Sequence, residues 1–295
     1  MSSKAKKTIL IAVAVVCILV CVGSGLFLYQ YYHGVQVEST LLERMKTGTA
    51  EISSAPAPSD QPEQDSGETP EESETDAVPS EEEPLMKTVR LPVDFAQLQA
   101  EAPDIYAWLE LPDTGIDDPV LQRAGADLFY NSHNAYGQYY MCGAVFSQSA
   151  YNGRNFDSPM TVLYGHSTVL GQPGAFMELN NYADEAYFDA HREMRVYMPD
   201  GMYVYRIFAA CVHSNEHLLY CHDFSDETQF DAFFSSLTED TSPDSHIDAE
   251  ALPQAGDKVL TLSTCYSANK NLRYLVMGVL EEFVPTAEAA GREAA

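Results

Sequence analysis

Short apolar runs separated by turn-forming residues recur through the second half of the chain. Each run is four to nine residues long, and glycine, asparagine, proline or aspartate residues stand between the runs. Frequent short strands of this kind are typical of a closed or nearly closed β-barrel. The predicted strands are 143–146, 160–164, 194–198, 202–208, 259–262 and 272–280.

Helical spacing of apolar residues interrupts this pattern in a few places. Residues 93–109 are predicted to form two short helices, one on each side of Pro103. Further helices are predicted at 175–182 and 226–237, and the latter lies in a long insertion between two strands, residues 213–257. The phenylalanines on its apolar face are Phe230, Phe233 and Phe234.

A long, mostly apolar stretch lies close to the N-terminus. The stretch from Ile9 to Tyr32 follows three lysines and is long enough to cross a bilayer as a helix. A cleaved signal peptide is the alternative, but the stretch is longer than a signal-peptide core and no small-x-small cleavage site follows it. Because the lysines precede the span, the N-terminus is expected in the cytoplasm and the rest outside. We therefore expect a basic cytoplasmic tail at 1–8 and a single-pass membrane anchor at 9–32.

An acidic extracellular linker is predicted at 33–85, followed by a folded domain at 86–285 and a polar tail at 286–295. Residues 51–83 hold twelve Asp or Glu and no Lys, Arg or His, so they cannot bury enough apolar surface to fold. A flexible linker of about fifty residues reaches roughly 40 Å. The net charge of −28 argues against nucleic-acid partners. Residues 86–295 hold 30 acidic and 11 basic residues and carry −19 of that charge.

The six cysteines do not predict a disulfide framework. Cys17 and Cys21 lie in the predicted anchor, and the other four are scattered without paired spacing. They are Cys142, Cys211, Cys221 and Cys265. The run Cys211-x-His213-x3-His217-x3-Cys221-His222 holds metal-capable side chains, but its spacing matches no zinc pattern, so no metal site is predicted.

Three residues suited to one chemistry stand at the ends of predicted strands. The run Thr261-Leu-Ser-Thr-Cys265 ends on a cysteine, and Arg273 begins the next apolar run eight residues later. The run Thr161-Val-Leu-Tyr-Gly-His166 ends on a histidine. Taken singly, each could be structural: a buried thiol, a core histidine, a surface arginine. Together they are the thiolate nucleophile, the proton carrier and the fixed cation that cysteine-based acyl transfer needs.

The TLxTC run, the Tyr-Gly-His run and the downstream arginine resemble the sortases, the membrane-anchored transpeptidases of Gram-positive bacteria. The resemblance covers roughly residues 90–285. Helices before the barrel, an insertion with a helix before the cysteine strand, and opening strands within residues 111–122 make the chain most similar to class B. The resemblance implies a mostly β fold, a sortase-like closed barrel with these additions, preceded by the transmembrane helix.

The resemblance also implies roles for individual residues. Cys265 would attack the carbonyl of a threonine in a sorting motif, His166 would act as general acid and then base, and Arg273 would stabilise the oxyanion. The positions that match the family's substrate groove are Asp127, Leu128, Tyr164, Ser263 and Thr264, with Leu219 and Tyr220 in the insertion. Asp127 stands where the family has an uncharged asparagine, and Tyr266 is a further departure.

The implied substrates are surface or pilin proteins with a C-terminal sorting motif, and the implied acceptor is an amine of the peptidoglycan precursor. No cofactor is expected. Polymerisation of pilins is a close variant that no residue distinguishes. Two rival classes of peptidoglycan enzyme are disfavoured. Papain-like hydrolases place Cys before His, whereas here His166 precedes Cys265. L,D-transpeptidases carry Ser-x-Gly-Cys, whereas here Thr264 precedes Cys265. A binding module without catalysis is disfavoured because all three reactive residue types are present. The LPxTG string at 111–115 is predicted to be a strand and turn rather than a sorting signal, since no apolar stretch and basic tail follow it.

Overall fold

The computed structural model describes residues 12–25, 28–29, 40, 42–46 and 87–293. All of the strands lie in the last of these ranges, and each of the six predicted runs overlaps a strand, although β8, β10 and β11 extend beyond the predicted ends. The strands are β1 Ile105–Glu110, β2 Asp117–Leu121, β3 Val145–Phe146, β4 Met160–Tyr164, β5 Thr168–Val169, β6 Gln172–Pro173, β7 Glu193–Met198, β8 Gly201–His213, β9 His246–Ile247, β10 Val259–Cys265 and β11 Arg273–Pro285.

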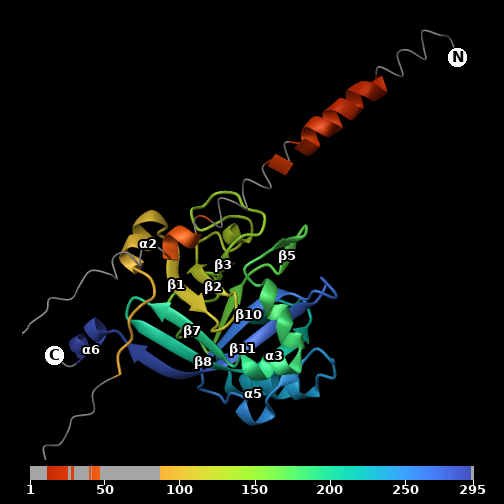
Figure 1. Cartoon of the computed structure of the whole chain (residues 1–295). Coiled ribbons are helices and arrows are strands. Elements are labelled where there is room, and N and C mark those ends of the chain that lie inside the picture. Colours follow the sequence, from red (N-terminus) through yellow and green to blue (C-terminus); the bar gives the residue numbers. More distant parts are fainter. Residues whose placement is uncertain (1–11, 26–27, 30–39, 41, 47–86, 294–295) are drawn as a thin grey trace, which may run out of the picture.

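Eight of the described strands close into a barrel (Figure 1). Their order is β11-β10-β4-β3-β2-β1-β7-β8, and the long strands β8 and β11 pair antiparallel to complete the ring. Strand β9 pairs with β8 outside the ring, and β5 and β6 form a separate hairpin. The predicted closed barrel is therefore confirmed, and β10 lies between an antiparallel partner, β11, and a parallel one, β4.

The helices confirm part of the sequence prediction and correct another part. The helix expected at 226–237 is present as α5, but the second helix expected within 93–109 is wrong, because Ile105–Glu110 is strand β1. This strand is buried on both faces, since Ile105, Trp108 and Leu109 are all nearly inaccessible to solvent. A run that is buried on both faces shows no period-2 alternation, so its apolar spacing also fits a helix. The helices are α2 Phe95–Glu101, η1 Phe129–Asn131, η2 Met177–Ala183, α3 Glu185–Ala190, α4 Leu218–Cys221, α5 Glu227–Ser236, η3 Leu237–Glu239, η4 Ala249–Ala251 and α6 Ala287–Glu293.

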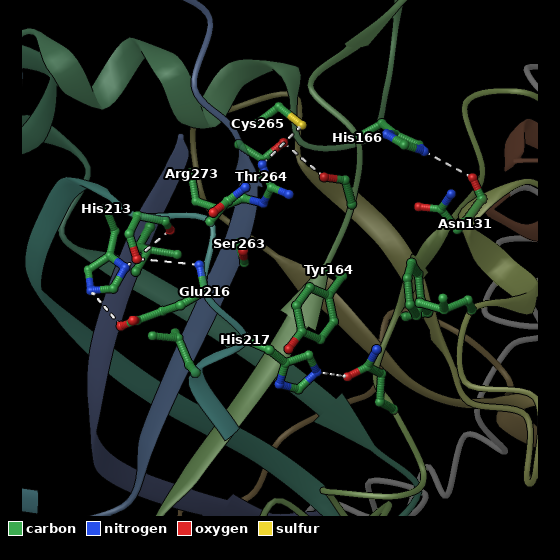
Figure 2. A pocket seen from close by; sticks show the side chains of 18 residues that line it. Asn131, Tyr164, His166, His213, Glu216, His217, Ser263, Thr264, Cys265 and Arg273 are labelled. Atoms are coloured by element: carbon green, nitrogen blue, oxygen red, sulfur yellow. Dashed lines mark hydrogen bonds and ion pairs between the residues drawn. The ribbon is translucent and has the colours of Figure 1, made fainter. Parts of the chain in front are cut away.

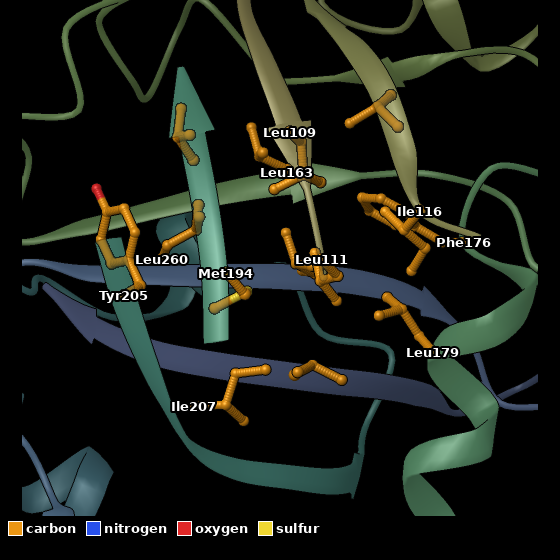
Figure 3. Packing of buried hydrophobic residues seen from close by; sticks show 14 of the residues in the cluster. Leu109, Leu111, Ile116, Leu163, Phe176, Leu179, Met194, Tyr205, Ile207 and Leu260 are labelled. Carbon is orange, nitrogen blue, oxygen red and sulfur yellow. The ribbon is translucent and has the colours of Figure 1, made fainter. Parts of the chain in front are cut away.

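Alternate residues of β10 serve two different cores. Leu260 and Leu262 point into the barrel interior, where they pack with residues such as Leu109, Leu163 and Ile207 (Figure 3). Val259 belongs instead to a second cluster on the outer face of the strands. Because successive side chains of a strand point to opposite faces, Ser263 and Cys265 lie on the same outer face as Val259.

The insertion between β8 and β10 covers this outer face. Its helices α4 and α5 contribute Leu218, Phe230, Phe233 and Phe234 to the outer cluster, against side chains of β4, β8, β10 and β11. The part of the outer face that these helices cover begins at Leu218. Beyond Leu218 the ends of β4 and β10 line a cavity. The three phenylalanines therefore have the role that their spacing predicted, which is to hold the insertion on the barrel.

The ends of the folded domain differ from the prediction in two respects. Within the predicted linker, residues 42–46 are helical and packed on the barrel: Met45 is 5% exposed in a cluster with Phe95 and Trp108, and Lys46 pairs with Asp117 at 2.8 Å. At the other end, the predicted polar tail forms α6 directly after β11, and Val89 pairs with Thr286 beside it.

The remainder of the linker and parts of the predicted anchor lie outside the described residues. Residues 12–25 are helical and exposed. Within the described part of the chain, no single helix reaches the length and apolarity that a membrane span requires.

Candidate active site

Strand register brings Cys265 and His166 together. The parallel pairing of β10 with β4 ends on Ser263 and Tyr164, and Cys265 and His166 each follow two residues later. Neighbouring strands lie about 4.8 Å apart, so the two side chains lie side by side at the same end of β10 and β4. Two neighbouring bonds hold this edge: Gly165 N–H donates to the Ser263 carbonyl at 3.3 Å, and the Thr264 hydroxyl donates to the Gly165 carbonyl at 2.8 Å.

Arg273 lies directly opposite Cys265 on the antiparallel partner strand β11. Its Nη1 is 3.9 Å from the Cys265 sulfur and donates to the Leu272 carbonyl at 3.2 Å. The cation is therefore fixed beside the thiol by cross-strand pairing and by a backbone carbonyl. A permanent positive charge in this place stabilises a thiolate or an oxyanion formed on the substrate.

His166 is half-buried and hydrogen-bonded away from the thiol. Its Nε2 lies 2.9 Å from the Asn131 carbonyl, and Figure 2 shows this edge of the ring directed towards Asn131 while the Cys265 sulfur lies on the other side. A carbonyl oxygen can only accept, so Nε2 carries the proton in this arrangement. The imidazole thus holds a proton next to the nucleophile.

The three residues line one cavity of about 270 Å³ on the outer face of the barrel (Figure 2). Of the predicted groove residues, Leu128, Tyr164, Ser263 and Thr264 also line it. The other lining residues are Asn131, Phe146, Gln148, Gly165, His213, Ser214, Asn215, Glu216, His217, Leu218 and Leu275.

Three predicted groove residues lie outside this lining. The Asp127 carboxylate accepts hydrogen bonds from the Ser149 hydroxyl and the backbone N–H groups of Ser149 and Ala150, so it joins two loops rather than facing a substrate. Leu219 packs on the edge of the outer cluster, and Tyr220 is 77% exposed. The structure does not bring these three into the cavity with Cys265.

Other residues of the site were missed at the level of sequence. Asn131, Gln148 and His217 reach the cavity from loops or helix ends, where no periodic pattern marks them. Asn180 was also missed: its amide donates to the Cys265 carbonyl at 3.3 Å and accepts from Ser267 N–H at 2.8 Å, so it holds the chain on both sides of the following residue.

Tyr266 links the end of the cysteine strand to the insertion. Its hydroxyl donates to the Asp244 carboxylate, and its ring stacks on Tyr274 with centroids 5.9 Å apart. The Tyr274 hydroxyl donates to the Asp244 carbonyl at 2.8 Å. Tyr266, which departs from the family pattern, therefore holds the loop after Cys265 against the insertion.

The structure also places the two other motifs. Leu111 is 1% exposed and its N–H donates to the Ile116 carbonyl, so residues 111–115 form the predicted turn between β1 and β2. In the metal-capable run, Cys211 is buried in the outer cluster, where burial raises the pKa of its thiol to about 12. Among the described residues no group of three His, Cys, Asp or Glu side chains is placed to hold a metal ion.

Comparison with known proteins agrees with this geometry. Residues 109–281 match the model of the sortase domain. Sortase B of Listeria monocytogenes is 26% identical over 172 residues, which are 58% of this chain and 67% of that protein.

Solved structures give the same result. A sortase B from Bacillus anthracis superposes with a TM-score of 0.53 at 26% identity, covering 64% of this chain and 84% of the other. A Streptococcus pyogenes class B sortase involved in pilus biogenesis superposes equally well at 26% identity, covering 64% and 98%. With the domain match spanning more than half of its length, the chain belongs to the sortase family of cysteine transpeptidases and is most like class B.

Proposed function

We propose that this enzyme cleaves a threonine-containing sorting motif of surface proteins and transfers the new acyl group to an amine of the peptidoglycan precursor. The observation that carries the proposal is the placement of Cys265 between Arg273 on the neighbouring strand β11 and His166, which lies two residues past the end of the neighbouring strand β4, all lining one open cavity. The catalytic roles given to the three residues are part of this proposal.

The first half-reaction forms a thioester. The Cys265 sulfur attacks the threonine carbonyl carbon, and negative charge gathers on the carbonyl oxygen beside the Arg273 guanidinium. His166 has by then taken the proton of the Cys265 thiol, so its imidazolium carries two protons. The C–N bond to the next residue breaks, and the leaving amine takes one of these protons, which leaves His166 neutral. For Nε2 to deliver it, the bond from Nε2 to the Asn131 carbonyl must open, so that carbonyl holds the proton-bearing ring until substrate arrives.

The second half-reaction regenerates the enzyme. An incoming amine attacks the thioester carbonyl and loses its proton to the neutral His166, while the Cys265 thiolate leaves. A new amide joins the threonine carboxyl to the acceptor. The cavity reaches the exterior of the barrel rather than its lumen, so an acceptor attached to a polymer can approach.

The membrane location of the enzyme is part of the same proposal. The lysines before the apolar stretch 9–32 favour a single-pass anchor with the N-terminus in the cytoplasm and the catalytic domain at 86–285 outside. Assembly of pili from lysine-bearing subunits is the second candidate, favoured by the similarity to a Streptococcus pyogenes class B sortase involved in pilus biogenesis.

Peptide transfer by the purified chain tests the reaction. The full chain in detergent, with Cys265 or with Cys265→Ala, is incubated with a library of threonine-containing peptides and with triglycine or diaminopimelate. We expect mass spectrometry to show cleavage after threonine and ligation to the amine, both lost in the variant. Turnover of peptidoglycan fragments without any reaction of threonine peptides would refute the proposed substrate.

A further inference from the structure

The backbone around the nucleophile runs past the end of one of its neighbouring strands. Strand β10 pairs with β4 up to Ser263 and Tyr164, and Gly165 N–H then donates to the Ser263 carbonyl at 3.3 Å. Strand β4 ends at Tyr164, so it does not reach the stretch from Cys265 to Ser267. On this side, the carbonyl and N–H groups of that stretch need partners from another part of the molecule.

The side chain of Asn180 supplies these partners. Its Nδ2 donates to the Cys265 carbonyl at 3.3 Å, and its Oδ1 accepts a hydrogen bond from Ser267 N–H at 2.8 Å. A residue of a parallel strand beside Tyr266 would bond to the same two groups, the carbonyl before Tyr266 and the N–H after it. An asparagine amide can do this because it holds a donor and an acceptor in one plane. The Asn180 side chain therefore continues the sheet where β4 ends.

Asn180 is itself fixed to the barrel and to the backbone of His166. It lies in η2, and both Phe176, directly before this helix, and Leu179, within it, are 0% exposed in the interior core (Figure 3). The Phe176 N–H donates to the His166 carbonyl at 3.0 Å. The short segment from Phe176 to Asn180 therefore joins the backbone of His166 to the backbone of Cys265, and its buried side chains anchor it in the barrel.

We propose that Asn180 is a positioning residue for the reaction, which holds the Cys265 sulfur in place relative to His166 and Arg273. The sulfur lies 3.9 Å from the Arg273 Nη1, at the end of β10. Without the two bonds of Asn180 this strand end can move, and displacement of a reacting group by about 1 Å can cost about a hundred-fold in rate. This inference rests on the proposed function, because the rate in question is that of thioester formation.

Rapid kinetics separates positioning from peptide binding. The full chain in detergent, as wild type, Asn180→Ala or Asn181→Ala, is mixed with a threonine-containing peptide that the wild type cleaves, and thioester formation is followed by rapid quench and mass spectrometry. We expect Asn180→Ala to lower the rate at saturating peptide about ten-fold. The half-saturating concentration should stay within about two-fold, because Asn180 does not line the cavity. Asn181 is exposed, so Asn181→Ala is expected to keep the wild-type rate. Tyr266 and Asp244 still hold the loop from the insertion, so Asn180→Ala is expected to fold.

A carboxyl group at this position tests the donated hydrogen bond directly. Asn180→Asp keeps the shape and can still accept from Ser267 N–H, but an ionised carboxylate cannot donate to the Cys265 carbonyl. A protonated carboxyl has both a donor and an acceptor, and so restores both bonds. We therefore expect the rate of this variant, divided by the wild-type rate at the same pH, to rise at least about three-fold between about pH 8 and about pH 5. A residue needed only for folding would show no such recovery.

The outcomes distinguish the positioning role from the proposed reaction. A saturating rate of Asn180→Ala within about two-fold of that of Asn181→Ala overturns the positioning role, and so does a loss confined to the half-saturating concentration. If thermal unfolding shows that Asn180→Ala fails to fold, Asn180→Asp decides, and absence of recovery at low pH overturns the role.

Alkylation of Cys265 tests the positioning without any peptide. If the wild type cleaves no threonine-containing peptide, the proposed function fails, and the rate at which iodoacetamide modifies Cys265 is read by mass spectrometry of proteolytic peptides. Asn180→Ala is expected to slow this modification at least about three-fold, because the thiolate is no longer held beside the Arg273 guanidinium. Equal rates in Asn180→Ala and Asn181→Ala would overturn the positioning role.

Discussion

Removal of the Arg273 guanidinium is expected to slow thioester formation by between about five-fold and a thousand-fold. The Arg273 Nη1 lies 3.9 Å from the Cys265 sulfur. Unit charges at this separation attract each other by about 1 kcal/mol in water and about 4 kcal/mol at an effective dielectric constant of 20. Arg273 is half-buried at the edge of an open cavity, so its contribution falls between these limits. Loss of a single oxyanion donor costs a similar factor of about 10² to 10³ in other enzymes.

The measurement is the rate of thioester formation on a saturating threonine peptide, followed by rapid quench and mass spectrometry. Arg273→Lys keeps the charge but loses the planar fork, so we expect a loss smaller than that of Arg273→Ala. Arg206→Ala is the matched control, because Arg206 also leaves the barrel surface but pairs with Glu281 at 2.6 Å, outside the cavity. A rate for Arg273→Ala within two-fold of the wild type, in a folded protein, would refute the assignment of the cation.

Three further predictions concern the structure around the site. Thr264→Val is expected to cost about 1–2 kcal/mol in urea unfolding and to lower activity, because the Gly165 carbonyl loses its 2.8 Å bond from the Thr264 hydroxyl; retained activity would contradict a positioning role. Phe234→Ala, at a side chain 1% exposed, is expected to cost about 3–5 kcal/mol by denaturant unfolding, whereas exposed Thr228→Ala stays within about 0.5 kcal/mol; equal effects would argue that the insertion is not packed as described. Burial raises the pKa of Asp118 to about 6, so its folded state gains a proton that the unfolded state lacks between pH 6 and pH 4, and stability rises as pH falls through that window. In a pH series, Asp118→Asn should remove this gain, and an unchanged pH dependence would refute it.

The catalytic strand could be predicted from sequence because its signals are local. The run ending at Cys265 alternates between interior leucines and outward polar residues, and Arg273 begins the next strand after a short connection. Antiparallel pairing of two strands joined in this way places the two residues opposite each other. No sequence pattern shows that β4, which precedes His166, pairs with β10, because this parallel pairing joins segments about a hundred residues apart.

The remaining parts of the site depend on contacts that no local pattern records. Gln148 lies 69 positions from His217, and Asn180 lies 85 positions from Cys265. Polar side chains in loops have no periodicity, so only the closed fold shows which of them meet. The helix wrongly predicted over β1 has a related cause, since burial on both faces depends on the neighbouring strands β2 and β7.

The packing of residues 42–46 on the barrel changes the distance at which the enzyme can stand from the bilayer. If the predicted anchor ends at Tyr32, nine residues lie between it and Leu42, and the ten extended steps from Tyr32 to Leu42 span at most about 35 Å. The acidic segment 47–86 then starts and finishes on the domain itself, at Lys46 and Lys87, and adds nothing to the stand-off. If the enzyme is anchored as predicted, its substrates must come within that distance of the membrane surface.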